Sequence, residues 1–152
     1  MSGIVGSAGS KSGVIGTTEL DYEEGFHTTV VGSSGGGSTT YDSTAMGYTK
    51  IGNQVFCNGL IGLLDPSGLS DGAFTLTLPF LSSASAGHRS GCYILVEGNA
   101  TSNLADYVGA IGTSASILTV YLGDNIYFQA DSANQANVNT GFFLSFFYTT
   151  DL

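Results

Sequence analysis

The stretch Ala45–Leu64, A-M-G-Y-T-K-I-G-N-Q-V-F-C-N-G-L-I-G-L-L, decides the fold of this chain. Its Gly52-Asn53 pair predicts a tight turn, because both residue types tolerate a positive φ angle. After the turn the side chains alternate with a period of two, which is the pattern of a strand with one buried and one mixed face. The buried face takes Val55, Cys57, Gly59, Ile61 and Leu63, and the mixed face takes Phe56, Asn58, Leu60 and Gly62. This strand-turn-strand unit predicts an all-β protein.

Similar alternation recurs along the rest of the chain, and no segment predicts a helix of more than one turn. The spacing of turn signals predicts about eight or nine strands in one antiparallel β-sandwich or jelly roll. Besides the pair around Gly52, the strand candidates are Phe26–Val31, Ala73–Phe80, Gly91–Glu97, Tyr107–Ile111, Ser116–Leu122, Ile126–Ala130 and Gly141–Thr150.

The last of these strands is the most apolar, and it is apolar on both faces. Phe142, Leu144, Phe146 and Tyr148 share one face, and Phe143 and Phe147 lie on the other. A strand buried on both faces belongs in the middle of a sandwich or at a subunit contact. Leaving two phenylalanines in water would invite aggregation, so we expect Phe143 and Phe147 at an oligomer interface.

The charge balance excludes several classes of partner. The chain has 152 residues and a net charge of −9, with only three basic residues, too few to neutralise a run of phosphates or to dock on anionic lipid. No apolar run approaches the roughly 20 residues that cross a bilayer. The start has no apolar block typical of a signal peptide, so we expect synthesis in a cytoplasm, with Cys57 and Cys92 reduced and facing inward.

The N-terminal residues repeat one phrase. Ser2-Gly3-Ile4-Val5-Gly6-Ser7 is echoed by Ser12-Gly13-Val14-Ile15-Gly16-Thr17. A β-branched pair between glycines builds no core alone, so these residues are either a free tail or an extended arm docked on another surface. We expect an arm over residues 1–24 and a sandwich domain over 25–152. The acidic phrase Glu19–Glu24 fits a strand edge with a solvated carboxylate face or a divalent-cation site, although the spacing of a calcium loop is absent.

Candidates for catalysis are few. Neither His27 nor His88 has a cysteine, histidine or carboxylate partner at metal-ligand spacing, and no G-x-S-x-G elbow occurs. The glycine-rich stretch Gly32–Thr40 lacks the Gly-Lys-Ser/Thr sequence and the helix of a phosphate-binding loop. We therefore expect no enzymatic activity, no metal and no cofactor.

Several phrases spread over most of the chain are similar to those of one protein family. The chain resembles small virion proteins of tailed bacteriophages, especially marine and cyanobacterial ones. The matching phrases are Met1–Gly16, Glu19–Gly25, Gly47–Asn53 with Val55, Phe74–Phe80 and Phe146–Thr150.

The resemblance implies a homotrimeric β-domain in the virion, assembled in the host cytoplasm, with phage capsid or tail proteins as partners. It implies that the arm attaches the subunit to the particle, with Ile4, Val5, Val14 and Ile15 as the contact residues. Two roles remain open: a capsid decoration (cement) protein, or a tail-fibre or head-fibre tip that binds a host surface glycan or protein. The short chain leaves no room for a fibre shaft and its loops lack clustered aromatics, which favours decoration.

Overall fold

The computed structural model describes residues 21–37, 39–40, 43–62, 68–70, 72–85, 87, 90–97, 107–122, 126–127 and 141–151. Within these ranges the protein is all-β, as predicted, and contains no helix that could span a membrane. The strands are β1 (Tyr22–Thr28), β2 (Val31–Ser33), β3 (Ala45–Ile51), β4 (Gln54–Gly62), β5 (Phe74–Thr77), β6 (Ser90–Glu97), β7 (Tyr107–Ile111), β8 (Ile117–Leu122), β9 (Ile126–Tyr127) and β10 (Gly141–Thr149).

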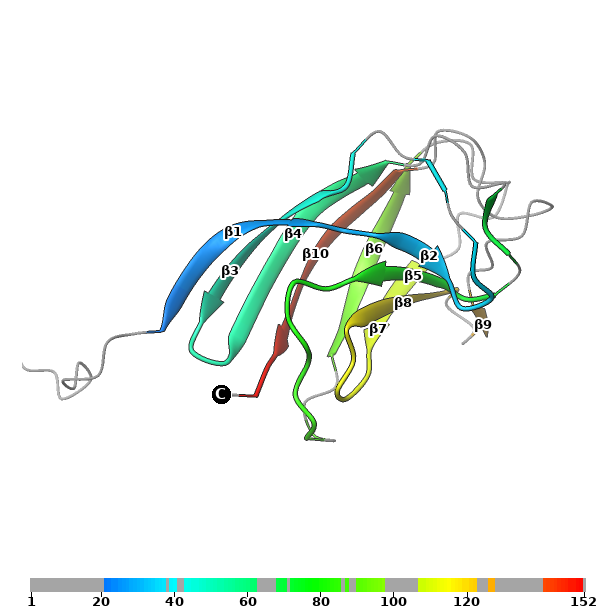
Figure 1. The fold of residues 1–152 in the computed structure, drawn as a ribbon. Coiled ribbons are helices and arrows are strands. Elements are labelled where there is room, and N and C mark those ends of the chain that lie inside the picture. Colours follow the sequence, from blue (N-terminus) through cyan, green and yellow to red (C-terminus); the bar gives the residue numbers. More distant parts are fainter. Residues whose placement is uncertain are drawn as a thin grey trace, which may run out of the picture.

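All strand pairs are antiparallel, and the hydrogen-bonded order is β1-β3-β4-β10-β6-β7-β8-β5-β2, with β9 beside β8. The strands lie in two layers that face each other, as Figure 1 shows. One layer consists of β1, β3, β4, β10 and β6, and the other of β7, β8, β5 and β2. The protein is therefore an antiparallel β-sandwich, with the closing strand β10 inside one layer between β4 and β6.

The chain crosses from one layer to the other between β1 and β2. The amide of Thr29 still donates to the Thr44 carbonyl on the β3 side, at 2.8 Å. One residue later, the Val30 carbonyl accepts from the amide of Thr77, at 3.1 Å, at the end of β5. The Val30 amide also donates to the Thr77 hydroxyl at 2.8 Å. The chain itself thus connects the first and last strands of the hydrogen-bonded order, and these bonds hold the crossing against the β3 side and β5, so this edge of the sandwich is closed.

The β3–β4 hairpin has the predicted turn. Gly52 adopts a φ of 59°, in the left-handed region that favours glycine. The pairing places Tyr48 opposite Cys57 and Lys50 opposite Val55 on the inner face. Cys57 and Cys92 are both free thiols; Cys57 is buried, and Cys92 packs against the core.

The core lies between the layers and includes the predicted inner face of β10. The rings of Phe74 on β5 and Phe142 on β10 meet across the layers, with centroids 5.0 Å apart. The Tyr148 hydroxyl accepts from the Phe80 amide and donates to the Phe80 carbonyl, at 3.1 Å each. Side chains with less than 2 % exposure fill the rest: Met46, Val55, Ile61, Leu76, Ile94, Leu118 and Val120.

The first strand differs from the prediction. The segment Phe26–Val31 is not one strand, because the chain changes layers at Thr29 and Val30, and β1 begins earlier, at Tyr22. Tyr22–Glu24 thus lie in the sheet although the sequence pattern assigned them to the arm. The Lys50–Asp21 ion pair and the bond from the Tyr48 hydroxyl to Glu23 hold this acidic segment beside β3. The remaining arm, residues 1–20, lies outside the described residues.

Candidate functional site: an aromatic outer face

The outer surface of the β1-β3-β4-β10-β6 layer carries apolar side chains that no part of the described chain covers. We call them the outer aromatic face. Its most exposed member is Phe26 on β1, at 84 %, followed by Leu95 at 58 % and Phe147 at 57 %. Its members are Phe26, Phe56, Leu60, Leu95, Phe143 and Phe147, and the exposed side chains of Tyr22 and Ile51 lie on the same side of the layer, beside the β3–β4 turn.

The register of the strands explains why these side chains meet. Residues directly opposite in neighbouring strands point to the same face of a sheet. Phe56 pairs with Phe147, and Leu60 pairs with Phe143, which in turn pairs with Leu95. The rings of Phe56 and Phe147 are 6.2 Å apart between centroids. Strands far apart in sequence thus form one apolar surface.

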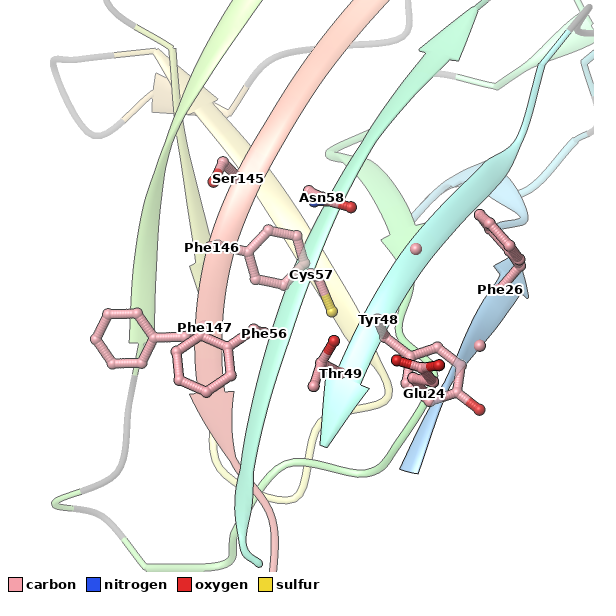
Figure 2. Close-up of a pocket in the computed structure, with 12 residues that line it drawn as sticks. Glu24, Phe26, Tyr48, Thr49, Phe56, Cys57, Asn58, Ser145, Phe146 and Phe147 are labelled. Atoms are coloured by element: carbon pink, nitrogen blue, oxygen red, sulfur yellow. The ribbon is translucent and has the colours of Figure 1, made fainter. Parts of the chain in front are cut away.

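A groove of about 750 Å³ crosses this face, and its surroundings are shown in Figure 2. The floor follows a second row of paired residues, Gly47, Asn58 and Ser145. Phe26 stands on one side of the close-up and the Phe56–Phe147 pair on the other. The lining residues are Glu24, Gly25, Phe26, Gly47, Tyr48, Thr49, Phe56, Cys57, Asn58, Ser145, Phe146 and Phe147.

Gly47 keeps the groove open. A Cβ atom at this position would stand 2.9 Å from the Asn58 Oδ1 atom and 3.7 Å from the nearest atom of the Phe26 ring. The glycine therefore leaves the space between Phe26 and Asn58 empty. A second, shallower hollow of about 490 Å³ continues the groove past Ser145 toward Phe143 and Leu95.

The polar groups of the groove are available to a partner. Within the described part of the chain, the side chains of Thr49, Asn58 and Ser145 make no hydrogen bond. Of the lining residues that the structure describes, only Glu24 is charged, and its carboxylate accepts a hydrogen bond of 2.6 Å from the Tyr22 hydroxyl. This bond and the nearby negative charge raise the pKa of Tyr22. The groove thus offers apolar walls, a floor of hydrogen-bonding groups and one anionic rim.

The acidic segment at the start of β1 is engaged within the sheet. Asp21 pairs with Lys50, Glu23 with the Tyr48 hydroxyl, and Glu24 with the Tyr22 hydroxyl. Among the described residues, no three histidine, cysteine or acidic side chains gather as a metal site would require. The described carboxylates of this segment are therefore bound to tyrosine and lysine side chains of β1 and β3.

Of the two histidines considered as chemical candidates, His27 does not line the groove. The His27 Nε2 atom is 3.0 Å from the Thr77 hydroxyl, where β1 approaches β5. Burial lowers the pKa of His27, since the cation loses water, and the hydrogen bond with Thr77 opposes this shift. His88 lies outside the described residues, as do the proposed attachment residues Ile4, Val5, Val14 and Ile15.

Of the predicted interface residues, Phe143 and Phe147 both lie on the outer aromatic face. The sequence pattern places Phe56 and Leu60 on a mixed face, and it assigns neither these two residues nor Phe26 and Leu95 to a site. The alternation in β4 carries the signal for Phe56 and Leu60, but which strands flank β10 depends on tertiary pairing.

Comparison of the chain with protein families, with curated proteins and with solved structures finds no match.

Proposed function

We propose that this chain is a structural protein of a tailed-bacteriophage virion. It is a homotrimeric decoration protein of the capsid, attached to the particle by its N-terminal arm. The phrases shared with small phage virion proteins support this assignment. A β-sandwich without a cluster of metal ligands among its described residues is also compatible with a structural role.

The observation that carries the proposal is the exposed outer aromatic face. A phenylalanine side chain buries about 200 Å², so at the exposures of its four phenylalanines this face leaves roughly 450 Å² of aromatic surface in water. Leu60 and Leu95 add to it. The largest apolar patch of a typical monomer is about 300–600 Å² and is often functional, and a standard interface buries about 800 Å² per partner. Contact between subunits through Phe143 and Phe147 would remove much of this surface from water.

The oligomeric state is tested by light scattering on the purified protein. We expect about three times the chain mass of 15.6 kDa. A stable monomer at micromolar concentration would contradict the trimer.

Attachment is tested by adding purified protein to particles that lack it and measuring occupancy. Deletion of residues 1–18 should abolish binding while the sandwich stays folded, because the core side chains of the described residues come from Val31 onward. A deletion variant that still binds at full occupancy would show that the β-domain itself contacts the virion. A reconstruction that places the protein at a fibre tip would replace decoration with the host-binding alternative.

A further inference from the structure

The groove on the outer aromatic face has the chemistry to hold an extended segment of chain. Successive side chains of an extended strand point to opposite sides. A strand laid along the row of Gly47, Asn58 and Ser145 would therefore direct one side chain toward Phe56 and Phe147. Its next side chain would point toward the row on the other side, which contains Leu60 and Phe143. The free polar groups of Asn58 and Ser145 lie beneath the strand, where its backbone amides and carbonyls need partners.

One segment of this chain matches these requirements. We propose that residues 12–17 of one subunit lie in the groove of a neighbouring subunit. In Ser12-Gly13-Val14-Ile15-Gly16-Thr17, the adjacent β-branched residues supply one apolar side chain for the Phe56–Phe147 row and one for the Leu60–Phe143 row. Glycines on both sides of the pair let the backbone approach the floor closely. The inference rests on the proposed oligomer and gives its arm a second task.

Charge complementarity supports the same segment. Among the described residues, Glu24 is the one charged residue of the groove lining. Lys11, directly before the segment, is the one basic residue among residues 1–20 of a chain that has only three. Lys50 is already paired with Asp21. An arm whose Lys11 lies near Glu24 brings a cation to the anionic rim.

The reach of the arm favours a neighbouring subunit over the same chain. The chain enters β1 beside the β3–β4 turn, where the Asp21 carbonyl accepts a 2.6 Å bond from the Gly52 amide. Asn58 lies level with Phe26, five residues along β1 from Asp21, and two strands across the sheet. With the usual rise per residue and spacing between strands, the distance from Asp21 to Asn58 is about 19 Å. Ile15 lies six residues before Asp21, so its own arm would need full extension, about 20 Å, and a sharp reversal at Asp21. The residues Glu19–Glu24 contain no glycine, proline or asparagine, and the carboxylate of their one turn-favouring residue, Asp21, is paired with Lys50.

The two copies of the repeated phrase then contact different partners. The second copy, with Val14 and Ile15, lies against the neighbouring subunit. The first copy, with Ile4 and Val5, lies ten residues further from the sandwich and remains for the capsid.

The test is disulfide trapping between subunits, with the first phrase as a matched control. One chain carries Val14→Cys and a second carries Ser145→Cys, at an exposed position in the groove. The two are mixed in denaturant, refolded together and oxidised. Burial raises the pKa of Cys57 to about 12 and that of Cys92 to about 11, so the native thiols do not compete. The control replaces Val14→Cys by Ile4→Cys, the equivalent position of the first phrase.

For the mixture of Val14→Cys and Ser145→Cys chains we expect a band at about twice 15.6 kDa on a denaturing gel, and this band should disappear on reduction. The mixture with Ile4→Cys in place of Val14→Cys should give no such band. Equal trapping by Ile4→Cys, or no trapping at all, would overturn the proposal. A double variant can also be made that carries Val14→Cys and Ser145→Cys on one chain. If its disulfide forms only within that chain, the groove holds the same subunit's arm and the exchange between subunits is overturned.

A second measurement separates this inference from the proposed function. Val14→Ser with Ile15→Ser should weaken the trimer, seen as loss of mass on dilution, whereas Ile4→Ser with Val5→Ser should leave the trimer intact and reduce particle occupancy. Unchanged particle occupancy with Ile4→Ser and Val5→Ser, while trapping by Val14→Cys persists, would count against the function alone. An unchanged trimer with Val14→Ser and Ile15→Ser would count against the inference alone.

Discussion

Phe146 and Phe147 are neighbours in the sequence and in β10, yet the sandwich treats them in opposite ways. Phe146 points between the layers and is 7 % exposed, whereas Phe147 points outward and is 57 % exposed. The residue type is the same, and the strand period of two alone separates the two environments. The comparison teaches that one strand of this protein serves two purposes: its inner face holds the fold together, and its outer face is available to partners.

Emptying the two phenylalanine sites in turn should give the largest difference. Phe146→Ala is expected to lower the free energy of unfolding by about 3–5 kcal/mol, because it removes core contacts and leaves a cavity. Phe147→Ala should cost about 1 kcal/mol of the stability of a single subunit, because within the subunit its ring already meets water on one side. Urea unfolding of both variants, compared at a single protein concentration, measures the gap. Equal losses would show that the outer ring is part of the folding core.

Polar substitution on the outer face should change association more than folding. Phe143→Ser with Phe147→Ser is expected to lower the light-scattering mass from about three chains toward one, because water then solvates the contact surface. Far-ultraviolet circular dichroism should remain that of a β protein. The matched control is Thr119→Ser with Ser116→Ala on the opposite layer, which should leave the mass unchanged. A double variant that stays trimeric would remove Phe143 and Phe147 from the interface.

The inner face can be examined with a smaller change, the removal of one hydroxyl. Tyr148→Phe leaves the amide and the carbonyl of Phe80 without their partner, so we expect a loss of about 1–3 kcal/mol in the free energy of unfolding. Tyr22→Phe is the control, because the Tyr22 hydroxyl bonds to Glu24 at the surface and its loss should have no measurable effect. The midpoint of urea unfolding reports both changes. Comparable shifts for the two tyrosines would show that the Tyr148 bonds contribute no more than surface contacts.

The smallest expected effect is the pH dependence due to His27, at the closed edge between the layers. Its folded-state pKa lies below the usual value of 6.5, so the unfolded chain takes up the proton first as the pH falls. The contribution of neutral His27 to the free energy of unfolding is therefore fully present above about pH 6.5. It declines below that pH and levels off once the folded histidine is also protonated. The effect is small because the ring is largely solvated. Urea midpoints between pH 7.5 and 5 should fall more for the native chain than for His27→Gln; parallel curves would contradict the assignment.

The β3–β4 hairpin and the closing strand β10 show which features of the fold local sequence signals can predict. Gly52-Asn53 predicted the turn, and the alternation of β4 and β10 predicted which side chains face inward, because both signals are local. The segment Phe26–Val31 was predicted as one strand, because local preference contains nothing about the change of layer at Thr29 and Val30. The hydrogen-bond partners of Thr29 and Val30 at that crossing are Thr44 and Thr77, which are distant in sequence.

The candidate site divides in the same way. The sequence by itself determined that Phe143 and Phe147 share the face opposite Phe142 and Phe146, since that follows from the period of an extended chain. Only the tertiary structure decided that Phe56 and Leu95 join them and that Gly47, Asn58 and Ser145 line up as the floor of a groove. The physical reason is that a strand's own period fixes which side a residue takes, whereas its neighbours across the sheet depend on pairing and register between strands that are distant in sequence.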